Sequence, residues 1–114
     1  MKLYLAIRWG HAESEDGPDG EDTQLIIRAS SFESASKLAD EAVRQLPVSS
    51  PLSSRPVQPF CHRMIELGAD GSTDRVERVL LGPWIGRALF DNNLYPSWVR
   101  DSVSEGWQDA KDYY

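Results

Sequence analysis

The chain has 114 residues, with 18 Asp or Glu against 12 Lys or Arg, which gives a net charge of −6. This length predicts a single domain covering residues 1–114, and the acidic charge argues against binding of nucleic acid, whose phosphates it would repel. The one cysteine excludes an internal disulfide, and no apolar run approaches the roughly 20 residues of a membrane helix. With no signal-peptide pattern at the start, we expect a cytoplasmic protein that does not engage a membrane.

Residues 2–29 predict two strands joined by an acidic loop. Lys2–Trp9 alternates with one strongly apolar face, and Thr23–Ala29 is a second run rich in apolar and β-branched residues. The connection, residues 10–22, holds six acids and no Lys or Arg, and its Gly and Pro residues break regular structure. Its candidate calcium ligands, Asp16, Asp19 and Asp22, lack EF-hand spacing. We therefore interpret the loop as a solvent-exposed hairpin tip without a metal.

The second strand leads directly into an amphipathic helix. Ser30 and Ser31 offer N-cap oxygens, and Glu33 stands three residues after Ser30, which is the spacing of a capping box. Apolar residues then recur at helical spacing as far as Leu46, and Pro47 ends the pattern.

The phase of this helix predicts which residues it buries. Leu38 and Val43 lie on the apolar face. The opposite face is expected to be exposed, and it carries Glu33, Lys37, Asp40, Glu41 and Arg44. On it, Asp40 and Arg44 form an acid–base pair four residues apart, which is a spacing that stabilises helices.

The chain then returns to extended structure. Residues 47–59 contain four prolines and four serines, which predicts a surface connection with polyproline character. Phe60–Leu67 and Arg75–Leu81 predict a third and a fourth strand, joined by a turn at Gly68–Asp74. A strand order of 2-1-3-4 would make the sheet wholly antiparallel. The helix is then expected on the face formed by Leu3, Leu5, Ile7, Leu25 and Ile27.

Cys61 and His62 are the residues that would suggest catalysis. Neighbours on a strand point to opposite faces, so the thiol and the imidazole should diverge rather than form a nucleophile–base pair. We interpret Cys61 as a buried structural cysteine and His62 as a half-exposed strand histidine. An enzyme with a small pocket near His62, using His62, Asp70 or Asp74, remains an alternative.

Residues 82–114 are acidic and hold seven of the eleven aromatic residues. We expect a short helix from Pro83 to Phe90 and a second one over Pro96–Glu105. Aromatic side chains at this density either complete a core or form an interface with a partner. We predict that Trp84 is core. The candidates for protein binding, lying at the margin of the domain, are Tyr95, Trp98 and Trp107.

The order strand, acidic loop, strand and helix, with the segment RASSFESASKLADEAV (residues 28–43), resembles small bacterial strand–strand–helix domains. Some of those domains are immunity proteins against toxins. The resemblance covers Met1–Leu46 and does not include the aromatic C-terminal segment.

Together these patterns predict an α+β domain. It has a four-stranded, mainly antiparallel sheet (ββαββ), one main helix on one face and short C-terminal helical segments. The most consistent function is a non-catalytic protein-binding module, for instance an immunity-like neutraliser of a basic protein, with no cofactor. A homo-oligomeric structural protein pairing through the sheet face is the alternative from another class.

Overall fold

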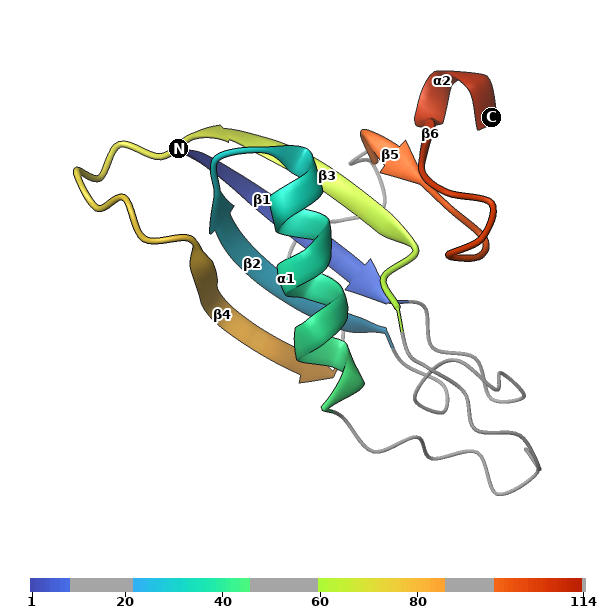
Figure 1. Ribbon diagram of the computed structural model, residues 1–114, viewed down its shortest axis with the longest axis horizontal. Helices are drawn as coiled ribbons and strands as arrows, with labels where there is room; N and C mark the ends of the chain where they lie inside the picture. The colour runs from blue at the N-terminus through green and yellow to red at the C-terminus, as the bar shows by residue number, and fades with distance from the viewer. Residues whose placement is uncertain (9–21, 46–59, 86–95, 114) are drawn as a thin grey trace.

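The computed structural model describes residues 1–8, 22–45, 60–85 and 96–113 (Figure 1). The predictions for the acidic loop up to residue 21, for the Pro/Ser-rich connection and for Tyr95 lie outside these residues. The elements in chain order are β1 (Lys2–Arg8), β2 (Thr23–Ala29), α1 (Phe32–Arg44), β3 (Arg63–Ala69), β4 (Arg78–Ile85), β5 (Trp98–Val99), β6 (Gln108–Asp109) and α2 (Ala110–Tyr113).

The fold is α+β, with an antiparallel sheet and one main helix, as the sequence predicts. The described sheet has six strands rather than four, in the order β4-β2-β1-β3-β5-β6. Figure 1 shows α1 lying across one face of the sheet and the C-terminal elements grouped beyond β3, on the side away from β4. No described helix is long and apolar enough to cross a membrane.

The predicted strand order 2-1-3-4 is wrong, because β4 pairs with β2 and not with β3. The loop after β3 therefore passes the ends of β1 and β2. Arg28 on β2 holds this loop by donating to the Val76 carbonyl and to the carboxylates of Asp70 and Asp74. At Gly82 the backbone has φ 92°, and a Cβ there would lie 2.7 Å from the Gln24 carbonyl oxygen, so only glycine permits this approach.

The helix packs on a different face of β1 from the predicted one. The register pairs Tyr4 with Ile27 and Ala6 with Leu25, so these four side chains share the face under α1. They belong to one buried cluster with the small helix residues Ala35, Ala39 and Val43. Both faces of β1 carry apolar residues, so its pairing with β2 decides which one meets the helix.

The other face of the sheet, opposite α1, carries Leu3, Leu5 and Ile7 from β1. Leu5 pairs with Ile26 on β2 and with Ile65 on β3, so those two residues share this face. Leu5 and Ile65 are buried, so the centre of this face is covered as well.

The helix begins one residue later than the capping-box pattern predicts. Ser31 is the N-cap, and its hydroxyl accepts from the Ser34 N–H at 3.2 Å. Ser30 instead donates its backbone N–H and its hydroxyl to the carboxylate of Glu77. Ser30 therefore binds Glu77, and Ser31 rather than Ser30 caps the helix.

The predicted faces of α1 are correct with two exceptions. Val43 is buried, and Lys37, Glu41 and Arg44 are exposed. Leu38 is only partly buried, against the edge of the core cluster. Asp40 was expected on the exposed face and is buried, because its partner comes from the C-terminal segment rather than from Arg44.

The predicted helix over Pro96–Glu105 is wrong, since Trp98–Val99 forms a strand there and pairs with Arg63 and Met64 of β3. Ser97 supports this pairing by donating its N–H to the Met64 carbonyl. The predicted helix from Pro83 begins on residues that belong to β4, and its remainder lies outside the described residues. Trp84 is partly buried rather than fully core.

Candidate functional site

Trp98 and Trp107, two of the three predicted binding residues, both pack against α1. The ring of Phe32 stacks on Trp98 with centroids 4.2 Å apart, and it meets Trp107 edge-on at 5.3 Å. Trp107 also donates its indole N–H to the Ser36 hydroxyl at 2.8 Å. The C-terminal segment therefore covers the start of α1, and these two residues do not lie over the opposite sheet face.

A buried ion pair fixes this segment in place. The guanidinium of Arg100, just after β5, contacts both carboxylate oxygens of Asp40 at 2.5 and 2.6 Å. Arg100 also donates to the Cys61 carbonyl, and the Cys61 N–H donates to Asp40. The guanidinium lies 4.2 Å from the centre of the Trp107 ring, a cation–π distance. The strand edge, the helix and the C-terminal segment thus meet at one charge pair.

Cys61 and His62 lie beside this pair, and neither is placed as a reactive group. Burial, and then the Asp40 charge, raise the pKa of the Cys61 thiol, so it stays protonated at neutral pH. His62 is buried rather than half exposed as predicted. Burial and the nearby arginines Arg63, Arg8 and Arg100 lower the pKa of His62 to about 4.

The structure separates the residues of the enzyme alternative. His62 donates its backbone N–H to Ile7 at one end of β1, and Asp70 donates to Met1 at the other end. Eight residues of extended chain span roughly 26 Å, so His62 and Asp70 cannot share a small pocket. Asp70 and Asp74 are instead bound to the guanidinium of Arg28.

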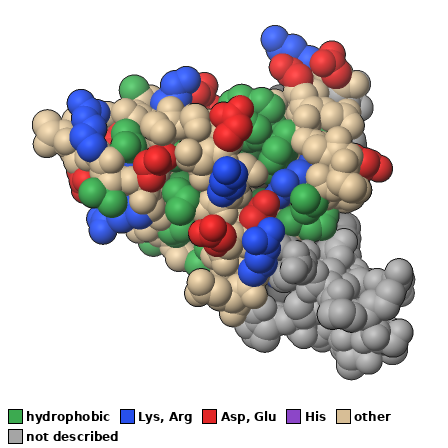
Figure 2. Space-filling view, in the orientation of Figure 1, with side chains coloured by type: hydrophobic (Ala, Val, Ile, Leu, Met, Phe, Trp, Pro, Cys, Tyr) green, Lys and Arg blue, Asp and Glu red, His purple; other side chains and the backbone are tan. Residues whose placement is uncertain are grey.

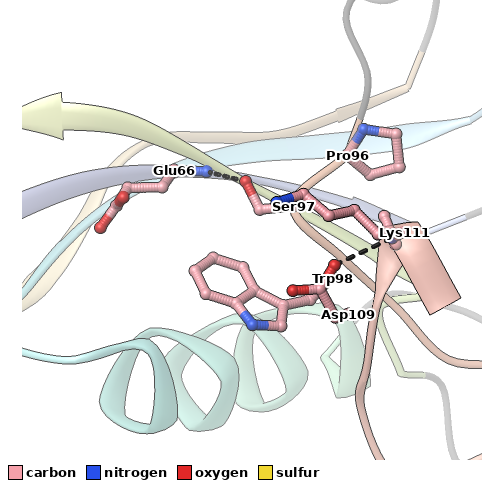
Figure 3. A pocket seen from close by; sticks show the side chains of 7 residues that line it. Glu66, Pro96, Ser97, Trp98, Asp109 and Lys111 are labelled. Atoms are coloured by element: carbon pink, nitrogen blue, oxygen red, sulfur yellow. Dashed lines mark hydrogen bonds between the residues drawn. The ribbon is translucent and has the colours of Figure 1, made fainter.

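A surface hollow lies where β5 begins alongside β3 (Figure 3). It has a volume of about 500 Å³, within the size range of ligand sites. Its lining comes from β3, β5, β6 and α2, and consists of Glu66, Pro96, Ser97, Trp98, Asp109, Ala110 and Lys111. Trp98 is therefore both a core-packing residue and a wall of this hollow, whereas Trp107 does not line it.

The carboxylates of the hollow are held by contacts that each use one oxygen. Lys2 binds Glu66 Oε1 at 2.7 Å, and the Lys111 N–H binds Asp109 Oδ1 at 2.9 Å. The Glu66 N–H donates to the Ser97 hydroxyl, which fixes the β3 side of the hollow to the start of β5 (Figure 3). In the view of Figure 3 the Trp98 indole lies between the two carboxylates.

Sequence reasoning found Trp98 but not Glu66, Asp109 or Lys111. The aromatic density of the C-terminal segment drew attention to Trp98. The other three residues are surface charges, and only the pairing of β5 with β3 brings them together. Whether Trp98 and Trp107 bind a protein stays a prediction, and Tyr95 lies outside the described residues.

Among the described residues, no group of three or more His, Cys, Asp or Glu is placed to hold a metal ion. Of the three candidate calcium ligands in the acidic loop, for which no metal was predicted, only Asp22 is described. Comparison of the chain with protein-family models, with curated proteins and with solved structures gives no match.

Proposed function

We propose that this protein is a non-catalytic protein-binding module whose partner is basic, of which an immunity-like neutraliser is one form. The observation that carries the proposal is the unequal burial of charge. Four arginines are buried, Arg8, Arg28, Arg63 and Arg100, but only one carboxylate, Asp40. Of the remaining described residues, eight acids and six Lys or Arg are exposed, and three more acids, Asp22, Asp70 and Asp74, are partly buried. The accessible surface of the described residues therefore carries more acidic than basic groups.

The distribution of these charges supports a broad electrostatic role. Figure 2 shows charged side chains of both signs over the helix face, with apolar side chains in separate patches between them. An excess of acidic groups attracts a basic partner over several ångströms, accelerates encounter and disfavours nucleic acid. The five acids at positions 13–21 add to this excess in the sequence.

The state of the candidate catalytic groups also supports a binding role. A thiol nucleophile needs a lowered pKa and access to substrate, but Cys61 is fully buried with a raised pKa. His62 is buried among arginines, and Asp70 and Asp74 lie at the other end of the strand.

The test is to capture proteins from cells of the source organism on the immobilised chain, identify them and repeat the binding with the purified candidate. We expect a partner of high isoelectric point whose affinity falls steeply between low and physiological salt. Glu41→Lys with Glu105→Lys, two exposed positions, should weaken binding. Lys37→Glu is the matched control and should not weaken it. A neutral or acidic partner, or affinity independent of salt, would contradict the proposal.

A second candidate is self-association through the sheet face opposite α1. It is favoured by the exposure of two leucines on that face, Leu81 at 53% and Leu67 at 36%. The burial of Leu5 and Ile65 restricts any such contact to the margins of the face. Light scattering over a hundredfold range of concentration distinguishes the two candidates, because only self-association raises the mass. Leu81→Ser should then return the mass to that of a monomer.

A further inference from the structure

We propose that residues 96–113, which hold β5, β6 and α2, form a cover that opens and closes over the start of α1 as one unit while the rest of the domain stays folded. This inference goes beyond the proposed function and does not depend on it. It rests on where the core lies, on how the cover is attached and on the position of one ion pair.

The core of the described residues is built without the cover. All ten residues of the buried apolar cluster lie between Tyr4 and Met64. Trp98 and Trp107 pack against this cluster from outside and are only partly buried. Because the cluster loses none of its members when the cover opens, the body of the domain keeps the burial that mainly stabilises it.

The cover is bonded within itself and is attached to the body along a short edge. Among the described strands β6 pairs only with β5, and the Ala110 N–H donates to the Ser97 carbonyl, so the two ends of the cover are joined. β5 reaches the body by pairing with two residues of β3. Figure 1 shows the cover beyond β3 at one end of the sheet. It can therefore open without separating any other pair of described strands.

The ion pair between Arg100 and Asp40 makes this opening all-or-none. Arg100 belongs to the cover, Asp40 belongs to α1, and both side chains are almost fully buried. A partial opening that removed Arg100 but left Trp107 over the helix would leave the Asp40 carboxylate buried without its partner, which is costly. Opening of the whole cover lets water reach both charges. Openings of contiguous units, smaller than global unfolding, are a general property of folded proteins.

Opening changes the surface at the start of α1. Phe32 loses both of its aromatic neighbours, Trp98 and Trp107. The Ser36 hydroxyl loses the indole N–H that it accepts, and the Asp40 carboxylate loses the guanidinium. The closed form therefore hides an aromatic and acidic surface that the open form presents.

The test is native-state hydrogen exchange of the full chain in low concentrations of urea, measured by NMR. Three amides report on the cover, because the N–H of Ser97 bonds to Met64, that of Arg100 to His62 and that of Ala110 to Ser97. We expect these three amides to exchange through one opening with a common equilibrium constant and a common urea dependence. The dependence should be weaker than that of the amides in β1 and β2, because opening exposes less surface than global unfolding.

Two variants separate the opening of the cover from global unfolding. Ile27→Val weakens the core of the open and closed forms alike, so it should accelerate exchange in β1 and β2 by about two- to tenfold and leave the three cover amides unchanged. Asp40→Asn weakens only the closed form, so it should accelerate all three cover amides by one factor, roughly tenfold or more. Glu41→Gln, at an exposed position beside Asp40, is the control and should change none of these rates.

If Ile27→Val accelerates the cover amides as much as those of β1 and β2, the cover unfolds only with the whole domain and the inference is overturned. Unequal responses of the three cover amides to Asp40→Asn would also overturn it, because the cover would then open residue by residue. Should Asp40→Asn fail to fold, the exchange of the unmodified protein and of Ile27→Val still decides between these outcomes.

Discussion

Two buried arginines, Arg100 and Arg28, each tie a peripheral segment to the body of the domain, but in different surroundings. The side chains of Arg100 and Asp40 are 5% and 10% exposed, and the pair joins the C-terminal segment to the middle of α1. Arg28 is equally buried, but one of its partners, Asp74, is 41% exposed. Its contacts join β2 to the loop between β3 and β4.

The two arginines differ in the number of their acceptors and in how far those acceptors are exposed to solvent. Arg28 donates to one carbonyl and two carboxylates of a single loop, so the loss of one contact leaves two others. Arg100 donates to one carboxylate and one carbonyl, and the side chain of that carboxylate, Asp40, is only 10% exposed, so it regains little water once its partner is removed. A buried charge left alone costs far more than an exposed one. Stability should therefore depend more on the Arg100 contact than on the Arg28 contact.

The largest expected effect is that of Arg100→Ala. The substitution leaves Asp40 buried without its partner and removes the cation over Trp107, so we expect a loss of about 3–5 kcal/mol in the free energy of unfolding. Urea unfolding followed by tryptophan fluorescence measures it. Arg44→Ala, at an exposed position on α1, is the control and should cost about 0.5 kcal/mol or less.

A double variant distinguishes an unpaired charge from lost packing. Replacing the pair together, Asp40→Leu with Arg100→Met, should cost less than Arg100→Ala alone, because no charge remains buried. A double variant at least as unstable as the single one would show that Arg100 acts mainly through its shape and its hydrogen bond to the Cys61 carbonyl.

The second prediction concerns His62, which neighbours the Arg100 pair. Its pKa is about 4 in the folded protein and near 6.5 when unfolded, so the unfolded state binds more protons between these values. This contribution is fully present above pH 6.5 and is lost as the pH falls towards 4, by up to about 3 kcal/mol. Stability measured against pH in a His11→Gln background should show this slope, and His62→Gln should remove it. If His62→Gln left the slope of stability against pH unchanged, this would mean that His62 is solvated in the folded protein.

The third prediction concerns Arg28 and is compared with that for Arg100. Arg28→Ala should cost about 1–3 kcal/mol, less than Arg100→Ala, because one of its two carboxylate partners, Asp74, is 41% exposed and regains water. Amide exchange should accelerate over the loop at 70–77 and in β4, and not in α1. A loss equal to that of Arg100→Ala would remove the distinction between the two contacts.

The same contrast shows what the sequence could predict. Local patterns gave β2 with its correct ends, the position of α1 and the burial of Val43 and Cys61, because period and propensity act over neighbouring residues. They could not give the partners of Asp40 or Ser30. Each of those residues is satisfied by a group more than 40 positions away, Arg100 or Glu77. Asp40 looked exposed because nothing on its own helix explains a buried carboxylate.

The strand order and the residues around the hollow could not be predicted from the sequence for the same reason. The pairing of β4 with β2 depends on the loop that Arg28 holds, and β5 exists because Trp98 and Val99 meet the edge of β3. A two-residue strand has no periodicity to detect, so the proline before it suggested a helix start instead. The sequence therefore identified Trp98 as a candidate but not the acidic residues around it.

The smallest expected effect is the pH dependence of Asp74. The Val76 N–H that Asp74 accepts, and then the charge of Arg28, lower the pKa of this carboxyl below its ordinary value. Its contribution to stability is therefore present above its unfolded pKa, near 3.9, and is lost as the pH falls through the folded value. Asp74→Asn retains an acceptor for the Val76 N–H and removes only the charge. The stability difference between the two proteins should be constant above about pH 5 and should shrink below pH 4, a window distinct from that of His62.

In an Arg28→Ala background the pH-dependent part should decrease but persist, because the backbone hydrogen bond is the larger cause. If it disappears entirely, the Arg28 charge alone governs the titration of Asp74.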